Sequence, residues 1–170
     1  MRFAHAVAVA IGCAAVWAGG FGDSVFAQPS KGCTIVSASP VAFGNYDSIT
    51  GAPLDVQGQI VYECGKGAGG KKGNGQVRDQ LSVQISVNQG TAGTFNRQME
   101  GGRDRLRYNL YLDAARIIVW GDGTGGTQTY AATAQPNGQL VTVPVFGRLF
   151  AGQDVAGGVY LDNLVVTLDF

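Results

Sequence analysis

Cys33 and Cys64 are the residues best suited to covalent chemistry in this chain of 170 residues. A third cysteine, Cys13, lies in an apolar stretch near the first residue and is lost if that stretch is an export signal. An even pair of cysteines in an exported chain is typical of a disulfide. We therefore predict a Cys33–Cys64 disulfide, which in the chain-entropy model stabilises the fold by about 3–4 kcal/mol. A two-cysteine metal site is the alternative, but no histidine remains to complete it.

The residue types needed for catalysis are scarce. His5, the single histidine, lies in the predicted export signal, so the mature chain has no imidazole for a Ser-His-Asp triad or a zinc site. Glu63 and Glu100 are the only glutamates, and the aspartates lie mostly in turn-like sequences. The sequence therefore predicts no catalytic residue, no metal ligand and no cofactor, and hence a protein that is not an enzyme.

Two glycine-rich stretches imitate ligand sites. Residues 65–72 nearly match the loop that cradles phosphate, but Lys72 replaces the magnesium-binding hydroxyl and no helix follows. Residues 122–125 contain one carboxylate, Asp122, which is too few oxygen ligands for calcium. We interpret the first stretch as a solvated loop and the second as a tight turn.

Four arginines form a loose basic cluster, namely Arg97, Arg103, Arg105 and Arg107. The last three alternate along a predicted strand, so we expect them to project to solvent together. They form either a solvated face or a contact with an acidic partner surface. The whole chain has 12 basic and 12 acidic residues, which gives no sign of nucleic acid or an anionic membrane as partner.

The elements that position these residues are predicted to be strands. Alternating apolar residues indicate about seven or eight strands, and no segment has a convincing helical period. The extended segments cover residues 32–38, 41–46, 56–64, 81–87, 106–112, 117–120, 140–150 and 157–170, with a loop or short irregular strands at 90–102. Regularly spaced strands with a disulfide favour an all-β sandwich in a single domain.

Residues 157–170 form the clearest of these strands. One face carries Tyr160, Leu164, Val166, Leu168 and Phe170, and Asp162 interrupts it. An apolar strand of this kind must pair on both sides or leave an open edge. We therefore expect another polypeptide to pair with this region, and assembly to be the function.

The first residues have the pattern of a secretory signal. Arg2 gives a basic start, and residues 6–17 form an apolar run that is too short to span a membrane. Cleavage after Ala27 has the better-shaped site, while cleavage after Ala18 also satisfies the small-x-small rule. We predict a signal peptide at residues 1–27 and a mature domain at 28–170 without a membrane span.

The order of several short motifs resembles the spore coat protein U domain, which is also the domain of the archaic, Csu-type chaperone–usher pilins. The matching positions are Cys33, 43–47 (FGNYD), Cys64, Arg97, Met99, 108–116 (YNLYLDAAR), 120–122 (WGD), 143–147 (VPVFG), 158–160 (GVY) and 165–170 (VVTLDF). Together they cover nearly all of the mature chain.

This resemblance implies an incomplete immunoglobulin-like sandwich that lacks its final strand. A periplasmic chaperone would supply that strand first, and the N-terminal extension of another pilin or coat subunit would replace it at the outer-membrane usher. The protein would pass through the periplasm to the cell surface. By resemblance, the apolar face of residues 157–170 listed above lines the groove for the donated strand or the adjoining core.

The cleavage site then decides whether the chain can donate a strand. Cleavage after Ala18 leaves an arm in which Phe21, Val25 and Ala27 alternate, whereas cleavage after Ala27 leaves five residues, 28–32, before Cys33. The first form is a self-polymerising subunit, and the second is a tip or coat subunit that only receives a strand.

A tip adhesin or carbohydrate- or surface-binding module is the alternative function. Three aromatic residues, Trp120, Tyr130 and Phe146, would supply its stacking faces. Burial of at least two of them in the core would weigh against this alternative.

Overall fold

The computed structural model describes residues 3–12, 32–49, 51–65, 81–134 and 137–170. Ten strands lie in these segments: β1 (Phe3–Gly12), β2 (Cys33–Ala38), β3 (Gly44–Asp47), β4 (Leu54–Cys64), β5 (Leu81–Val87), β6 (Gln98–Gly101), β7 (Asp104–Tyr111), β8 (Tyr130–Ala134), β9 (Leu140–Leu149) and β10 (Val159–Asp169). A single 3-10 turn, η1 (Gly90–Ala92), is the one helical element of the described segments.

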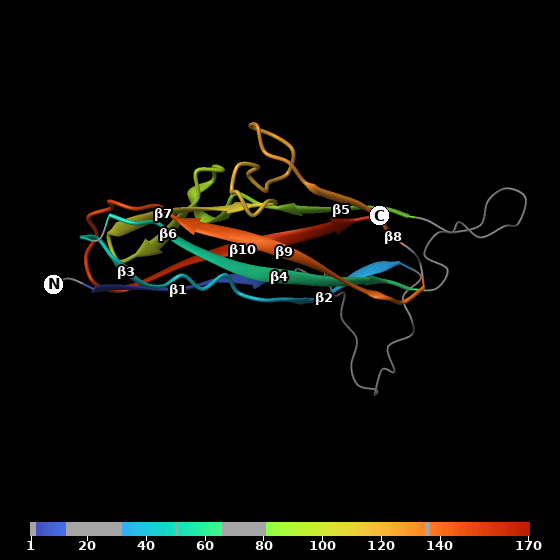
Figure 1. The fold of residues 1–170 in the computed structure, drawn as a ribbon, viewed down its shortest axis with the longest axis horizontal. Helices are drawn as coiled ribbons and strands as arrows, with labels where there is room; N and C mark the ends of the chain where they lie inside the picture. The colour runs from blue at the N-terminus through green and yellow to red at the C-terminus, as the bar shows by residue number, and fades with distance from the viewer. Residues whose placement is uncertain (1–2, 13–31, 50, 66–80, 135–136) are drawn as a thin grey trace, which may run out of the picture.

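The strands form two layers, and β4 and β9 cross in front of β10 in Figure 1. β2, β4, β9 and β7 pair antiparallel in that order, while β3, β1, β10, β5 and β8 follow one another in the second layer. β6 forms a hairpin with β7 and meets β10 at one bridge between Glu100 and Leu161, so it connects the layers. The predicted all-β sandwich is confirmed.

Alternate residues of the facing strands fill the space between the layers. Ile60 and Tyr62 of β4 face inward, as do Tyr160 and Leu164 of β10, and each is at most 1% exposed. This alternation is the period-two pattern that a half-buried strand requires. Of the inner face predicted for residues 157–170, Tyr160, Leu164 and Val166 are buried and Leu168 is partly buried, whereas Phe170 is exposed.

Two segments differ from the predicted strands. Residues 117–120 form a loop with isolated bridges at Val119 and Trp120, because the Asp113 carboxylate accepts hydrogen bonds from the N–H groups of Ile117 (3.0 Å) and Ile118 (2.7 Å) and holds a turn. β8 is a strand that the sequence pattern does not predict. Three of its five residues are alanine, which has a weak preference for strands.

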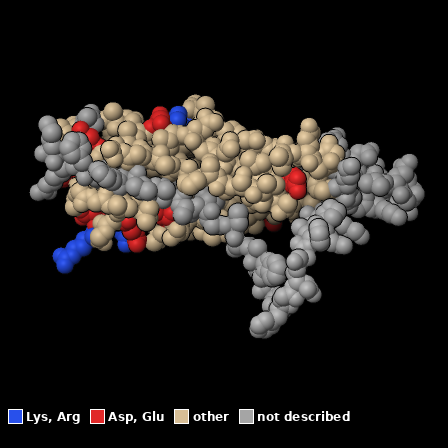
Figure 2. Space-filling model, turned by 90° about the horizontal axis from the view of Figure 1, so that it is seen from below, with Lys and Arg blue, Asp and Glu red and all other residues tan. Residues whose placement is uncertain are grey.

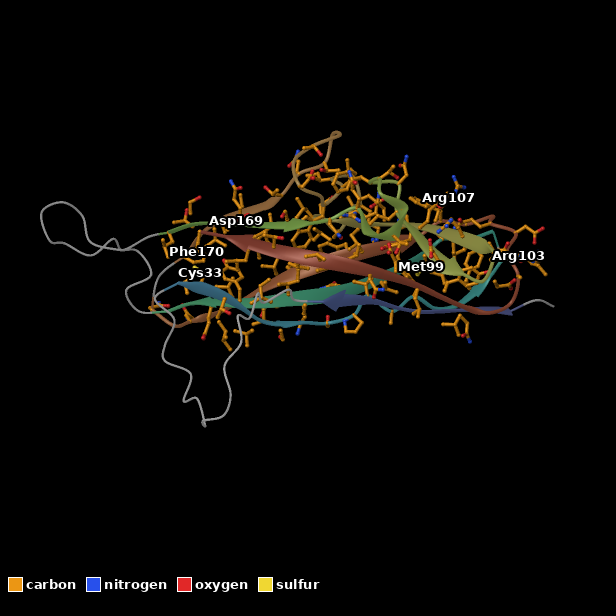
Figure 3. All side chains as sticks on the ribbon, turned by 180° about the vertical axis from the view of Figure 1, so that it is seen from behind. Cys33, Met99, Arg103, Arg107, Asp169 and Phe170 are labelled. Atoms are coloured by element: carbon orange, nitrogen blue, oxygen red, sulfur yellow. A yellow bond between two sulfur atoms is a disulfide. The ribbon has the colours of Figure 1, made fainter. Side chains whose placement is uncertain are left out.

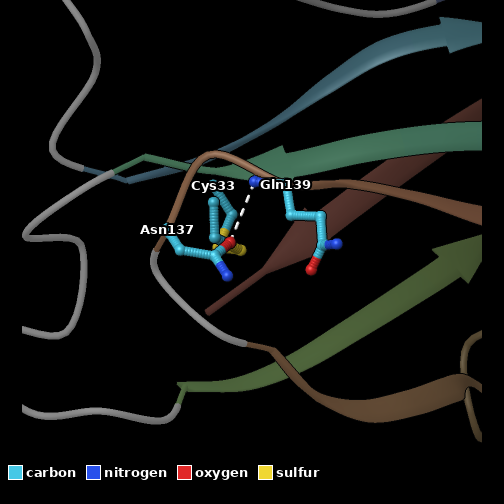
Figure 4. Close-up of a disulfide and its surroundings, with 4 residues drawn as sticks. Cys33, Asn137 and Gln139 are labelled. Carbon is cyan, nitrogen blue, oxygen red and sulfur yellow. Dashed lines mark hydrogen bonds between the residues drawn. A yellow bond between two sulfur atoms is a disulfide. The ribbon is translucent and has the colours of Figure 1, made fainter.

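The predicted disulfide between Cys33 and Cys64 is confirmed. The two cysteines lie directly opposite each other in the β2–β4 pair. Figure 4 shows the turn before β9 beside them, where the Asn137 side-chain oxygen accepts a hydrogen bond from the Gln139 N–H at 2.9 Å. The disulfide therefore fixes the first residue of β2 to the last residue of β4.

The segment between β2 and β3 crosses from one layer to the other over two glycines. Val41 and Phe43 are 0% and 5% exposed. A Cβ on Gly147 would lie 2.6 Å from Val41 and 3.1 Å from Phe43, and a Cβ on Gly58 would lie 2.9 Å from Val41. The side-chain-free backbone of β4 and β9 therefore provides the space that this crossing segment occupies.

A charge cluster on the outer face joins β4 to β9. Asp55 accepts hydrogen bonds from Nε and Nη2 of Arg148, both at 2.7 Å, and lies 3.3 Å from Nε of Arg116. The hydrogen bond from Arg148 holds the pKa of Asp55 below its ordinary value of 3.8, and the charge of Arg116 acts in the same direction. The cluster thus favours the ionised carboxylate in the folded state.

Asp55→Asn is expected to destabilise the protein slightly at pH 7, by less than about 1 kcal/mol, because the side chains are partly exposed to solvent. A lowered folded-state pKa contributes stability above the unfolded value of 3.8, and this contribution is lost as the pH falls through the folded value. The difference between variant and wild type in urea unfolding should therefore be largest at pH 7 and should shrink as the pH falls below 3.8. If Asp55→Asn lost more stability at low pH than at pH 7, the stabilising role given to the ionised Asp55 would be wrong.

Candidate strand-pairing site

β1 lies between β10 and β3 and is hydrogen-bonded to both. It runs parallel to β10 in a register that places His5 opposite Val159 and Gly12 opposite Val165. It runs antiparallel to β3 over residues 3–6. Within the described residues, no other strand pairs with this side of β10, since β5 and β6 lie on its opposite side. The β1 position is therefore a slot between two strands that are not paired with each other.

Hydrogen bonds of two buried tyrosines hold β3 and β10, the two strands that form the walls of this slot. On β3, Tyr46 is 1% exposed, and its hydroxyl accepts a hydrogen bond from the Gln153 N–H at 2.7 Å. On β10, the Tyr160 hydroxyl donates to the Ala156 carbonyl at 2.8 Å. Burial, together with Asp104, raises the pKa of Tyr160, so this hydroxyl stays protonated and can donate. Both aromatic rings therefore keep fixed positions beside the slot.

Asp162, the residue that interrupts the apolar face of β10, is 1% exposed. Its carboxylate accepts hydrogen bonds from Thr91 N–H (2.8 Å), the Thr91 hydroxyl (2.6 Å) and the Tyr108 hydroxyl (2.7 Å). Burial and the neighbouring Asp162 charge raise the pKa of Tyr108, which keeps its phenol protonated as a donor. Gly90, at φ +67°, approaches so closely that a Cβ there would lie 2.3 Å from Asp162 Oδ2. The carboxylate thus ties η1 and β7 to the middle of β10.

Arg97 is 0% exposed, which contradicts its assignment to the loose basic cluster. Its guanidinium donates to the carbonyls of Asn88, Val87 and Trp120 and to the Asn109 side-chain oxygen. Burial lowers the pKa of Arg97, and the charge of Asp162 opposes this shift. The side chain therefore links the segments at residues 87–88, 109 and 120 through hydrogen bonds, and it is not available to a partner protein.

The other three arginines of that cluster, Arg103, Arg105 and Arg107, are exposed as expected. Arg105 forms an ion pair with Glu100 on the neighbouring strand β6. Arg103 and Arg107 have no ion pair within the part of the chain that the structure describes.

The five residues proposed to line a groove have different surroundings. Tyr160 and Leu164 lie in the stretch of β10 that pairs with β1. Val166 and Leu168 lie farther along, opposite Val87 and Ile85 of β5. The ring of Phe170 is 58% exposed and covers Gly32. Figure 3 shows Phe170 beside Cys33 and far from Arg103. The proposed donor-arm residues, Phe21, Val25 and Ala27, lie outside the described residues.

Of the three aromatic residues considered for carbohydrate stacking, Trp120 is buried, and Tyr130 and Phe146 are partly buried. Trp120 is 0% exposed, and its indole N–H donates to the Ile85 carbonyl at 2.9 Å. Tyr130 packs against Trp120, with ring centroids 6.3 Å apart, and Phe146 is half-buried. Trp120 therefore has no free face for a sugar, and Tyr130 gives one of its faces to Trp120.

The described segments have few features of other kinds of site. They contain no group of three or more His, Cys, Asp or Glu side chains arranged to hold a metal ion. They contain no buried side-chain nitrogen or oxygen without a hydrogen-bond partner. No helix among them is both long and apolar enough to cross a membrane.

Comparison with known proteins identifies the family. The model of the spore coat protein U domain matches residues 23–167. "Protein U" of Myxococcus xanthus is 31% identical over 170 aligned residues, which cover 79% of this chain and 93% of that protein. The chain therefore belongs to the spore coat protein U domain family. This is a family of structural coat proteins, so the prediction that the chain is not an enzyme is confirmed, and membership implies an extracellular surface location.

A solved structure shares the fold. It is the pre-assembly complex of the chaperone CsuC with the tip adhesion subunit CsuE, from the archaic chaperone-usher Csu pili of Acinetobacter baumannii. The match has a TM-score of 0.51 and 21% identity, and covers 81% of this chain and 39% of the matched chain. The described strands thus have a Csu pilin-like arrangement.

Proposed function

We propose that this protein is a structural subunit of a surface pilus or coat, completed by a strand that another polypeptide donates. The observation that carries the proposal is the place of β1. A segment with the sequence of an export signal occupies the slot between β10 and β3, and its removal on export would leave that slot open. An open edge beside an apolar core favours pairing with an added strand.

The route of assembly follows from the same slot. A periplasmic chaperone fills it first, and an outer-membrane usher then exchanges the chaperone strand for the arm of the next subunit. Support comes from the shared fold with a pilin subunit that was crystallised with its chaperone. Strand donation by this chain requires cleavage after Ala18, in place of the predicted cleavage after Ala27, because only that cleavage leaves an arm of residues 19–31. The family match, which begins at residue 23, overlaps this arm.

The direction of the donated arm follows from where the arm begins. Gly32, the first described residue after the arm, contacts Phe170 just past the end of β10. The arm leaves its own subunit at the end where Phe170 lies. If the arm ran parallel to β10, as β1 does, this end would meet the same end of the receiving subunit, and a third subunit could not be added. An arm that runs antiparallel to β10 joins unlike ends and repeats indefinitely. The arm in a fibre therefore runs opposite to β1.

The test uses a chain of residues 32–170, which has neither signal nor arm. Alone, it is expected to aggregate or unfold at low temperature, because the apolar walls of the slot are exposed. A peptide of residues 19–31 at one hundred times its Kd should stabilise it by about 2.7 kcal/mol and raise Tm by roughly 10 °C. The measurements are light scattering and thermal unfolding.

The matched control is the same peptide with Phe21→Asp and Val25→Asp, which should stabilise much less. If a peptide of residues 3–12 stabilises the chain but residues 19–31 do not, the slot accepts strands that this protein does not supply, as in a tip or coat subunit. A chain that is a stable monomer without any peptide would overturn the proposal.

A further inference from the structure

The two ends of the molecule carry different chemistry. We call the end with Gly32, Cys33 and Phe170 the disulfide end, and the end with Arg103 and Val159 the opposite end. Figure 3 shows Asp169 and Phe170 at the first and Arg103 at the second. On the face drawn in Figure 2, most charged atoms lie in the half toward the opposite end. A repeating fibre requires these two unlike ends to meet.

The disulfide end presents an exposed aromatic ring on a fixed base. Phe170 is 58% exposed, yet a Cβ on Gly32 would lie only 2.6 Å from its Cζ atom, so the ring rests directly on the residue that follows the arm. Asp169 beside it is exposed and has no ion pair within the described residues. This end therefore presents an exposed aromatic side chain next to a negative charge.

The opposite end contains a hollow of about 540 Å³ lined by residues 101–104 and 156–160. Its floor includes Gly101, where a Cβ would lie 2.6 Å from the Tyr160 ring, and its rim includes Val159, which is 54% exposed. Arg103, also in its lining, is exposed and free of ion pairs within the described segments. The lining also contains Asp104, whose carboxylate accepts a hydrogen bond from the Ala156 N–H at 2.7 Å. The hollow thus combines apolar surface with the positive charge of Arg103 and a carboxylate that is already hydrogen-bonded within the chain.

The arm brings the two features together. An arm antiparallel to β10 has its last residues beside Val159, at the mouth of this hollow. If the arm fills the ten residues that β1 occupies, three of its thirteen residues, 19–31, remain as a spacer. Three extended residues span about 10 Å. Gly32 of the donating copy, and the Phe170 ring that covers it, must then lie close to Val159 of the receiving copy.

We infer that Phe170 of one copy inserts into the hollow at the opposite end of the preceding copy, with Asp169 facing Arg103. This inference rests on the proposed strand donation, and it assigns a second contact between neighbouring subunits. The occupant is a second copy of this chain, because the spacer delivers that copy's own Phe170 to the hollow and the charges are complementary. Together, the two contacts fix the angle between successive subunits.

The test measures polymer formation by the exported protein in its native assembly, by sedimentation and electron microscopy. Phe170→Ala is expected to reduce polymer yield at least tenfold, whereas Ile117→Ala, at a side chain that is even more exposed (76%), should leave it unchanged. Asp169→Arg and Arg103→Asp should each reduce the yield, because each places like charges together. The double variant should restore it.

The result can be separated from failure of strand donation. The peptide of residues 19–31 should stabilise residues 32–170 equally in wild type and in Arg103→Asp, which lies outside the β1 slot. If the peptide binds and the single charge variants polymerise normally, the end-to-end contact is wrong and strand donation stands. If the peptide fails to bind even the wild-type chain, the proposed function itself fails.

Discussion

Replacing Arg97 with methionine is expected to lower the free energy of unfolding by about 4 kcal/mol. Methionine keeps a similar length and apolar stem, but it cannot donate to the carbonyls of Asn88, Val87 and Trp120 or to Asn109. These acceptors are left buried without partners, and the buried Asp162 loses a compensating charge. Urea unfolding, with the same partner strand in every sample, measures the loss.

Two further variants show what Arg97 contributes. Arg97→Lys keeps the charge but has a single donor centre, so we expect a loss of roughly half that of methionine. Arg107→Met removes an exposed arginine from β7 and should change the stability by less than about 0.5 kcal/mol. If Arg97→Met is as stable as Arg107→Met, the buried network does not hold the loops behind β10.

The second large effect is expected from the double variant Cys33→Ala, Cys64→Ala. Loss of a disulfide that spans 31 positions should cost about 3–4 kcal/mol through the greater freedom of the unfolded chain. It should also loosen the start of β2, from which the arm leaves. The measurement is urea unfolding with and without a reducing agent.

The reducing agent supplies the control. It should lower the stability of the wild type to that of the double variant and leave the double variant unchanged. A wild type that keeps its stability after both thiols are shown to be free would contradict the role given to this disulfide.

Local sequence patterns are sufficient to predict much of the fold. The alternation in β5 and β10 has a period of two, so it directly indicates which side chains face the core. Tyr160, Leu164 and Val166 are buried as this pattern predicts. The disulfide was equally accessible, because only two cysteines follow the predicted signal peptide.

The features that could not be predicted from local sequence depend on contacts between residues far apart in the chain. The sequence places Arg97 in a loose basic cluster with Arg103, Arg105 and Arg107, although Arg97 shares the alternation of the buried Met99. That spacing was a usable signal. Asp162 also occupies an inward position of β10, but its partners Thr91 and Tyr108 are 71 and 54 residues away. No local pattern identifies such partners.

The slot itself could be suspected but not located from the sequence. An apolar terminal strand requires partners, yet the pattern does not specify which side lacks one. The structure adds β3 as the second wall and the register along residues 159–165. These depend on the crossing segment before β3, which has few strand signals of its own.

That crossing segment extends the set of positions on which assembly depends. Gly58 and Gly147 touch neither the slot nor the ends of the molecule, yet a methyl group on either would meet Val41 within 3 Å. Relief of that clash would displace the segment that leads into β3, and with it one wall of the slot. A genetic screen for variants that are secreted but do not assemble should therefore recover substitutions at these two glycines. The positions found by such a screen would include residues that hold β3 in place as well as residues that line the slot.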